Sequence, residues 1–318
     1  MSEPKLHHYL PRFYLKGFAN DGKRLIQIEK ATGRVVPASI AKVAAIRDFH
    51  RLDYQNVKDP YSLEKLLSRI ESILAAALRD VCREGVRSRD DHVQLLQLVS
   101  LLRFRVPAMK AAIEEQHRQI VRAAGVFLER SGKLPNMPKA LERGFESGRI
   151  RILISNWKCL QQMFQMAFEP KLLSLLDRMK VTLIACEGKA HFCTSDQPVA
   201  LYHPSARAGQ LYAGALIDRD IQVALPLSRN RLLLLSWKKD APAERQADAS
   251  EVDEFNRRTA IMSSSYLFAQ RADDKLLGII RDNRKRFAGI GNPKMIELGR
   301  GKLQLMSFEP VLAAERYL

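Results

Sequence analysis

The sequence predicts an α+β fold: a helical middle region packs against a mainly antiparallel sheet from the last third of the chain, with a small N-terminal hairpin. The first observation is that apolar residues between positions 59 and 180 recur every three or four residues, the period of an amphipathic helix. The second is that the period changes to two from Val181 onwards, as in strands. Helices and strands that occupy separate stretches of one chain are typical of α+β proteins.

Two short segments near the N-terminus predict the hairpin. Lys23–Glu29 and Arg34–Pro37 are joined by a turn that contains Gly33, and glycine readily adopts the left-handed conformation of tight turns. The first long helix is expected over Asp59–Arg83. Its first residue can cap the helix, and Pro60 suits the first helical position.

A second, largely buried helix is expected to begin at Ser88. Asp91 stands three residues later, which gives an approximate capping box, and the sequence up to Phe104 is apolar nearly all round. Pro107 must then kink or break the helix, because it lacks a backbone donor and clashes with the preceding turn. The other elements expected here are a helix over 108–130, a loop over 131–138 and helices over 138–147, 153–167 and 170–179.

The last third of the chain alternates short strands with two helices. The strands expected are Val181–Cys186, His191–Thr194, Ile221–Leu225, Arg231–Trp237, Met295–Leu298 and Lys302–Ser307. The helices expected are Ser250–Met262 and 273–286, and Lys239–Asp248 has the composition of a linker. These boundaries divide the chain into an N-terminal region 1–58, a helical region 59–180 and a sheet region 181–318, with the last two forming one unit.

Length and composition restrict the class of protein. The chain has 318 residues, of which 46% are hydrophobic, so it can bury a sizeable core and is neither a disulfide-stapled miniprotein nor disordered. Its four cysteines form no C-x-x-C pair, so we expect reduced thiols and a cytoplasmic location. No leader segment and no run of 18 apolar residues is present, so we expect no membrane partner.

The charge of the chain predicts an acidic partner. The formal net charge is +17, with an excess of +7 (twelve Lys or Arg, five Glu) over residues 101–160 and of +5 (nine against four) over residues 271–302. Basic surfaces bind phosphates through counterion release, so nucleic acid is the leading partner; a basic surface that serves solubility is the alternative. The candidate nucleic-acid-binding residues are Arg103, Lys110, Arg118, Arg122, Arg284, Lys285 and Arg286.

The N-terminal run from His7 to Phe18 combines two histidines with four aromatic residues, among them Tyr14. The aromatic side chains can fill a gap between two parts of the fold. An imidazole held there has a pKa near neutrality and suits general acid or base catalysis, so His7 and His8 are candidate catalytic residues.

Two charged residues of the helical region are candidates for the same site. Glu64 and Glu71 are seven residues apart on the first helix, and both lie at the edge of its apolar stripe. A carboxylate there is either a solvated flank or a half-buried group with a shifted pKa, and Glu71 is the candidate for the second case. Arg105 ends a nearly apolar helix, so it must meet a structural carboxylate or a bound anion.

Thr194-Ser195-Asp196-Gln197-Pro198 directly follows a predicted strand. Asp196 in such a turn either bonds its own backbone or faces a cleft, where it could orient a histidine or, together with Glu71, hold Mg²⁺. The sequence contains no P-loop, no G-x-G-x-x-G, no G-x-S-x-G and no H-E-x-x-H, which disfavours NTP hydrolysis, Rossmann cofactors and common hydrolases.

In their order and spacing, these motifs resemble the family called domain of unknown function 4238. The resemblance spans His7 to about Gln270, and Leu102 departs from it, since a Gln is expected there. It implies a site drawn from His7 or His8, Glu71, Arg105, Asp196 and Asn256, but no reaction. It rests on His8-x-x-Pro11-x-x-Tyr14-Leu15-x-x-Phe18, Ile70-Glu71, Arg105-x-Pro107, Thr194-Ser195-Asp196-x-Pro198, Leu225-Pro226-Leu227-Ser228 and Phe255-Asn256.

Three functions follow as hypotheses. In a nuclease-like hydrolase, a histidine of the N-terminal motif transfers protons, Glu71 and Asp196 orient it or bind Mg²⁺, and Arg105 stabilises charge on the scissile phosphate; a metal-free mechanism is equally open. The alternative is a non-catalytic nucleic-acid-binding or defence-associated interaction protein, in which the same residues form a structural polar network. An enzyme acting on a small anionic substrate such as a nucleotide is a third hypothesis. One cleft that brings these groups to a single reacting atom favours chemistry, whereas closed pairs favour binding or structure.

Overall fold

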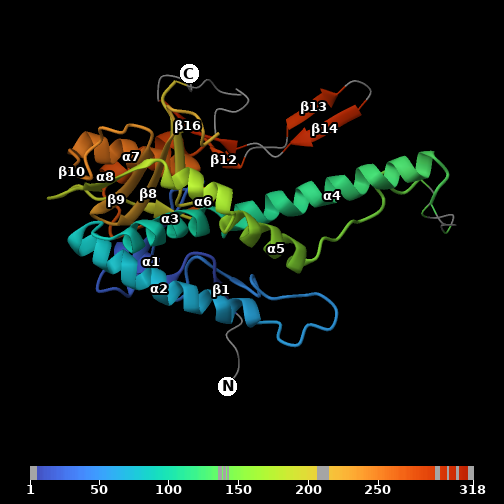
Figure 1. Cartoon of the computed structure of the whole chain (residues 1–318), viewed down its shortest axis with the longest axis horizontal. Coiled ribbons are helices and arrows are strands. Elements are labelled where there is room, and N and C mark those ends of the chain that lie inside the picture. Colours follow the sequence, from blue (N-terminus) through green and yellow to red (C-terminus); the bar gives the residue numbers. More distant parts are fainter. Residues whose placement is uncertain are drawn as a thin grey trace.

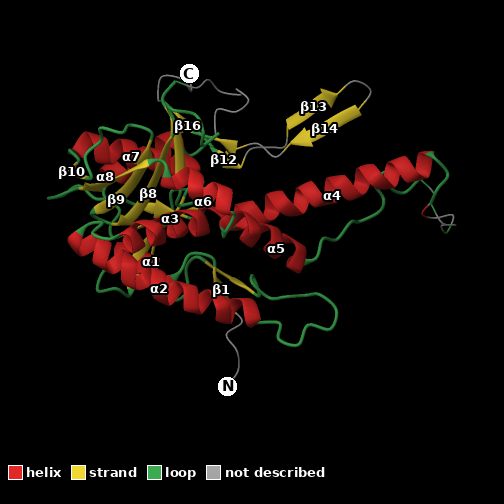
Figure 2. Ribbon diagram, in the orientation of Figure 1, coloured by secondary structure: helices red, strands yellow, loops and turns green. Residues whose placement is uncertain are grey.

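The computed structural model describes residues 6–134, 138, 141, 143–205, 215–290, 294–298, 301–305 and 308–313. These residues form the predicted α+β fold, in which helices and strands make up a main body from which one long helix projects (Figure 1; Figure 2). The hairpin near the N-terminus is also confirmed, with Gly33 in its turn at a φ of 76°.

The helical region contains the long helices of the molecule. Ser88 and Asp91 form the expected capping box, and Pro107 separates two helices instead of kinking one. The helices are α1 (Arg12–Leu15), the 3-10 helix η1 (Lys16–Phe18), α2 (Ser62–Glu84), α3 (Arg89–Phe104), α4 (Pro107–Arg130), α5 (Asn156–Ala167), α6 (Pro170–Asp177), α7 (Ala249–Met262) and α8 (Asp274–Asn283).

Two main sheets form the rest of the body. The larger has the strand order β10 (Glu244–Gln246), β5 (Lys180–Ala185), β9 (Arg231–Ser236), β8 (Gln222–Ser228), β7 (Ala200–His203) and β16 (Val311–Leu312). The smaller has the order β3 (Val35–Ser39), β2 (Arg24–Glu29), β11 (Tyr266–Ala269) and β6 (Thr194–Ser195). Three two-stranded pairs are β1 (Leu6–His8) with β4 (Ala45–Arg47), β12 (Gly289–Ile290) with β15 (Phe308–Glu309), and β13 (Lys294–Leu298) with β14 (Gly301–Leu305).

The main sheet is antiparallel except at its two edges. β10 pairs in parallel with β5, and β16 pairs in parallel with β7. The stretch 239–248, which we expected to be a linker, therefore supplies an edge strand. The sequence could not show this, because the strand is short and mostly polar.

Three other boundaries differ from the prediction. The first long helix begins at Ser62, because the Asp59 side chain accepts a hydrogen bond from the Tyr61 amide in a turn before it. Where we expected a helix over 138–147, residues 143–148 form turns, since Arg143 and Gly148 have positive φ; residues 135–137, 139–140 and 142 lie outside the described residues. The strand expected over 191–194 is reduced to Thr194–Ser195.

The N-terminal aromatic motif lies in the hydrophobic core. Tyr14 and Phe18 are completely buried, and the Tyr14 hydroxyl hydrogen-bonds to Thr194 Oγ1 at 2.7 Å and to the Pro226 carbonyl at 2.8 Å. Gly17 lies so close to β8 that an added Cβ would be 2.7 Å from the Leu227 carbonyl oxygen. The motif therefore fixes the N-terminal segment against both sheets.

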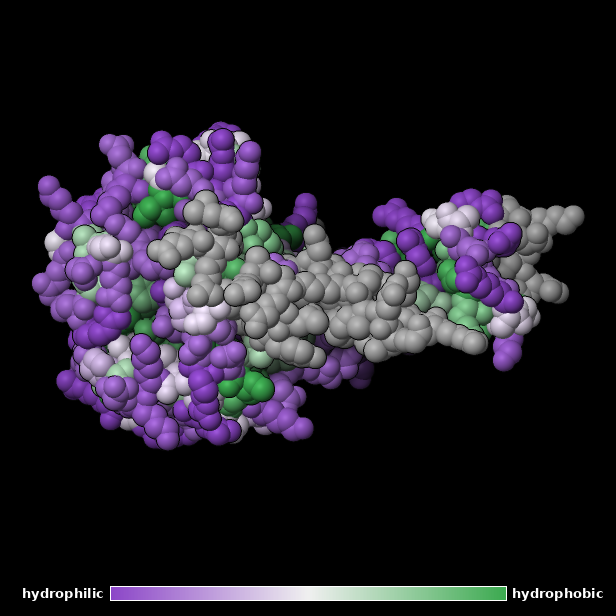
Figure 3. Space-filling model, turned by 90° about the horizontal axis from the view of Figure 1, so that it is seen from above, coloured by the Kyte–Doolittle hydropathy of each residue, from purple (hydrophilic) through white to green (hydrophobic). Residues whose placement is uncertain are grey.

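Helix α4 extends away from the main body (Figure 1). Ile113, near its start, is fully buried, whereas Ile120 and Phe127 further along are 58% and 66% exposed. Hydrophobic side chains also show at the far end of the projection in Figure 3, while hydrophilic ones cover most of the visible main body. Among the described helices, none combines the length and apolar character needed to cross a bilayer.

Candidate functional site

Arg105 is the centre of a buried polar network. Its side chain is 1% exposed and donates from Nη1 to Glu71 Oε1 at 2.5 Å, from Nη2 to the His8 carbonyl at 2.7 Å and from Nε to His50 Nε2 at 3.2 Å. A buried guanidinium requires such partners, since an unpaired charge in the interior is strongly unfavourable. Arg105, at the end of α3, thus meets the expected carboxylate in Glu71 of α2.

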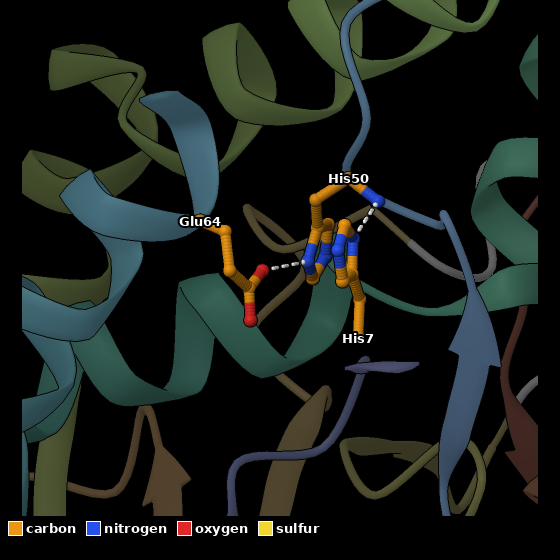
Figure 4. A group of neighbouring side chains, drawn as sticks. All are labelled: His7, His50 and Glu64. Atoms are coloured by element: carbon orange, nitrogen blue, oxygen red, sulfur yellow. Dashed lines mark hydrogen bonds and ion pairs between the residues drawn. The ribbon is translucent and has the colours of Figure 1, made fainter. Parts of the chain in front are cut away.

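The hydrogen bonds of His50 and His7 fix which ring nitrogen carries the proton, and Figure 4 shows the bonds that join these two histidines and Glu64. His50 Nε2 accepts from Arg105, so Nδ1 carries the proton and donates it to Glu64 Oε2 at 2.7 Å. His7 Nδ1 accepts from the His50 backbone amide at 2.9 Å, so its proton is on Nε2, which has no partner. Burial, followed by the charge of Arg105, lowers the pKa of His50 to about 3, so its imidazole is neutral.

His7, His50 and Glu64 have the composition of a metal site, because one ligand atom from each lies within 4.8 Å of the others. The proton positions oppose this use. A metal on His50 Nδ1 would need the lone pair of that nitrogen, while Nε2 already uses its own lone pair to accept from Arg105. A nearby guanidinium also repels a cation. The trio therefore fits a structural role.

Asp196 is the centre of a second buried cluster. Its carboxylate accepts hydrogen bonds from the Ser263 hydroxyl and from the amides of Ser264, Ser265 and Tyr266, at distances from 2.7 to 3.2 Å. Burial raises the pKa of Asp196, and these donors counteract the rise. The carboxylate thus holds the turn that follows α7 in place.

Lys30 holds the same turn from its carbonyl side. Its buried ammonium donates to the carbonyls of Ile261, Ser263 and Arg286 at 3.2, 2.7 and 2.8 Å. A cation is favoured at the last carbonyls of a helix, here α7. The turn between α7 and β11 is therefore fixed between a buried ammonium and a buried carboxylate.

Asn256 and Ser195 also have structural partners. Asn256 on α7 accepts from the Cys193 amide at 2.9 Å and donates to the His191 carbonyl at 2.9 Å. It thereby occupies backbone groups that a neighbouring strand would use, which explains why the predicted strand begins only at Thr194. The Ser195 hydroxyl donates to the Gln197 carbonyl at 2.8 Å inside its own turn.

The structure thus divides the predicted site between two places. His7, His8, Glu71 and Arg105 share the network, whereas Asp196 belongs to the turn after α7. Among the described residues, Glu71 and Asp196 belong to no group of three ligands able to hold a metal ion.

An open cleft lies between these two clusters. It has a volume of about 350 Å³. One wall comes from the N-terminal segment and the start of α4, and the other from β2, Asp196 and the turn after α7. The lining residues are Tyr9, Gln27, Lys42, Val43, Ala44, Ala45, Ile46, Pro107, Ala108, Asp196, Ser264, Ser265 and Tyr266.

Three of the sequence motifs meet at this cleft. Tyr9 follows the His7-His8 pair, Pro107 ends the Arg105-x-Pro107 motif, and Asp196 lies in the Thr-Ser-Asp motif. The network supports one wall directly, because Arg105 holds the His8 carbonyl and the Tyr9 amide bonds to Ala44. The Arg105 network, whose polar groups bind one another, therefore lies directly behind one wall of the open cleft.

Sequence reasoning missed several residues of both places. His50 is isolated in the sequence and carried no signal, whereas Glu64 was named beside Glu71 on the first helix but was not chosen for the site. Lys42, Ser264 and Ser265 lie in connecting segments, where only the Ser-Ser-Ser run could have drawn attention. Tyr9 lies in the same N-terminal run, but it is an unspecified position of the family pattern, which singled out Tyr14 instead.

The candidate nucleic-acid-binding residues differ in accessibility. Burial lowers the pKa of Arg103 to about 10, Lys110 lies over the Phe49 ring at 5.2 Å, and Arg118 pairs with Glu114 at 2.6 Å and with Glu115. The side chains of Arg122, Arg284 and Lys285 are exposed, and Arg286 is half-buried.

The comparison with known protein families decides the relationship. A family described as a protein of unknown function (DUF4238) matches residues 6–273. The chain belongs to this family. No curated protein and no solved structure matches it. The DUF4238 match covers the network, the Asp196 turn and every residue of the cleft, so all three are features of the family region of this chain.

Proposed function

We propose that this protein binds nucleic acid in the cleft, and that the buried network supports the cleft without reacting with the bound strand. One observation carries the proposal: three motifs far apart in the sequence meet at an open cleft, while the titratable groups beside it are closed in pairs. This corresponds to the non-catalytic alternative of the sequence analysis, in a reducing cytoplasm.

The side chains of the cleft suit a strand of nucleic acid. Tyr266, which is half-buried, offers an aromatic face for stacking, Gln27, Ser264 and Ser265 offer hydrogen bonds to base edges, and all four line the cleft. Its volume is within the usual range of small-ligand pockets, so it admits one unpaired nucleotide and not a duplex.

The charge of the protein supports the same partner. Lys42 lines the cleft and is exposed, and the net charge of +17 attracts polyanions from a distance. Binding that depends on phosphate contacts falls steeply with salt concentration, so affinity must be measured at several ionic strengths.

The nuclease hypothesis stays a prediction. Proton transfer requires a group within hydrogen-bond reach of the substrate, whereas His7, His50 and Arg105 have exposures of 0%, 0% and 1%. A nuclease would need these groups to open toward the strand, and the binding experiment can detect the cleavage.

The test is the binding of labelled single-stranded RNA, single-stranded DNA and duplex DNA, followed by fluorescence anisotropy. Lys42→Glu reverses a charge in the cleft, and we expect it to weaken single-strand binding by about tenfold, the effect of losing one charge-assisted contact. Lys58→Glu makes the same change at an exposed lysine that does not line the cleft, and should alter binding by no more than about twofold.

Equal weakening by the two variants, or binding to duplex that matches single strands, would contradict the cleft as the site. The same samples, incubated with Mg²⁺ or with EDTA and run on a denaturing gel, report cleavage. Intact strands support the binding function, whereas cleavage that is lost in His8→Ala, with folding preserved, establishes the nuclease instead.

A further inference from the structure

The start of α4 has free backbone donors at the cleft. The helix has 24 residues, its N-cap residue Val106 provides no side-chain cap, and its first turn contains no acidic residue. Pro107 has no amide hydrogen, and among the described residues the amides of Ala108 and Met109 have no hydrogen-bond acceptor. Free amides and the helix dipole together favour an anion at such an end.

A second observation, independent of the helix, points to the same ligand. Tyr9 is 94% buried (6% exposed), it lines the cleft, and its hydroxyl makes no hydrogen bond within the described part of the chain. The Tyr9 ring is buried, whereas its hydroxyl oxygen is accessible from the cleft and can donate to a ligand there. The contrasting case in this fold is Tyr14, whose fully buried hydroxyl has two partners within the protein.

The charges around the cleft permit an anion near α4. Lys42 is the cation among the lining residues, and it is exposed and makes no ion pair in the described residues. Asp196 is the carboxylate among them, but its two oxygens accept four hydrogen bonds from residues 263–266. The positive side of the cleft is thus the wall that contains Lys42 and α4.

We propose that a phosphate group binds at the start of α4, held by the free amides of Ala108 and Met109, the Tyr9 hydroxyl and the Lys42 ammonium. This phosphate subsite rests on the proposed nucleic-acid binding and specifies it further, because it names the part of the ligand that the cleft recognises. The same chemistry is offered by the phosphate of a free nucleotide and by that of a nucleic-acid strand.

The decisive variant is Ala108→Asp. Aspartate is favoured in the first turn of a helix, so the change keeps α4 stable while it places a negative charge where the phosphate would bind. Ala108→Asn has the same size without the charge and is the matched control. Tyr9→Phe removes only the free hydroxyl.

Binding is measured by calorimetry with adenosine 5′-monophosphate and with adenosine. We expect Ala108→Asp to weaken binding of the monophosphate by at least about tenfold, Ala108→Asn by no more than about threefold and Tyr9→Phe by about threefold to tenfold. None of the three should change adenosine binding by more than about twofold. Equal effects of the two Ala108 variants, or equal affinity of wild type for both compounds, would overturn the phosphate subsite.

The same variants tested with short single-stranded RNA, with and without a 5′-phosphate, identify the source of the phosphate. If Ala108→Asp lowers the affinity only for the 5′-phosphorylated RNA, the subsite binds a terminal phosphate. If it lowers the affinity for both RNAs equally, the subsite binds a backbone phosphate. If Lys42→Glu weakens strand binding and Ala108→Asp does not, the subsite is wrong and the cleft function stands. If the monophosphate responds to Ala108→Asp but no strand binds, the subsite stands and the nucleic-acid function is wrong.

Discussion

The Arg105 network and the cleft lie on the two sides of the same wall, yet their polar groups differ in one respect. In the network, Arg105 binds both Glu71 and His50, and within the described part of the chain His7 Nε2 is the buried side-chain atom of this network that has no partner. In the cleft, the Tyr9 hydroxyl and the amide of Ala108 have no acceptor in the described structure. Residue type alone therefore does not identify a functional site; unfilled hydrogen-bonding capacity next to open space does.

The largest expected effect comes from breaking the network at its centre. Arg105→Met leaves Glu71, His50 Nε2 and the His8 carbonyl without their donor, and we expect the free energy of unfolding to fall by about 3–5 kcal/mol. Urea denaturation measures the change. Arg69→Met, at an exposed position of α2, should cost less than about 0.5 kcal/mol. Similar losses in both variants would show that the network is not the stabilising element.

The Asp196 turn should be the next most sensitive place. Asn at this position keeps the shape but replaces one acceptor oxygen by a donor that faces backbone amides, so we expect Asp196→Asn to cost about 2–3 kcal/mol. Thermal unfolding measures the cost, with the exposed Asp240→Asn as control. If Asp196→Asn barely changes the free energy of unfolding but abolishes binding of single-stranded nucleic acid, the carboxylate contacts the ligand instead.

Acid should weaken the network through His50. Its pKa is about 3 in the folded protein and 6.5 in an exposed histidine, so between these values the unfolded state binds a proton that the folded state does not. Stability should fall as the pH drops from 6.5 toward 3, by about 1.4 kcal/mol per pH unit from this residue. His50→Gln should flatten the pH dependence of the free energy of unfolding measured in urea. An unchanged slope would mean that His50 is protonated in the fold.

The smallest expected effect is the loss of a hydroxyl from Tyr14 or from Tyr9. It compares the closed interior with the cleft directly, because the same atom is removed in both places. Tyr14→Phe leaves Thr194 and the Pro226 carbonyl without their partner and should cost about 1–2 kcal/mol. Tyr9→Phe removes a hydroxyl without a partner and should stay within about 0.5 kcal/mol. Chemical denaturation of both variants tests the difference. Equal costs would show that the Tyr9 hydroxyl is satisfied and not available to a ligand.

Much of the fold was predictable, because periodicity and capping are local. Ser88 with Asp91 gave the start of α3, Pro107 gave the break before α4, and Gly33 gave the hairpin turn. The edge strand β10 was not predictable, since its three polar residues become a strand only by pairing with β5. A short polar segment has no hydrophobic alternation from which such long-range pairing could be predicted.

The site was predictable only in part, for a related reason. The chemistry of Arg105 required a carboxylate, and Glu71 supplies it. Which polar residues close on one another depends on distances across the fold, so the sequence could not separate Asp196 from Arg105. It also could not distinguish Tyr9, with its free hydroxyl, from the fully bonded Tyr14.

The pairing of β2 with β11 also has a kinetic consequence. Ile28 lies opposite Leu267, so the smaller sheet joins strands from nearly opposite ends of the family region. Contacts of such high sequence separation form slowly. During synthesis, the edge of β2 that pairs with β11 stays unpaired until β11 has been made. A ribosome-bound chain that stops before Ser263 lacks both β11 and the four groups that donate hydrogen bonds to Asp196. The cleft therefore cannot be complete until the chain has been synthesised past Tyr266, because Ser264, Ser265 and Tyr266 line it.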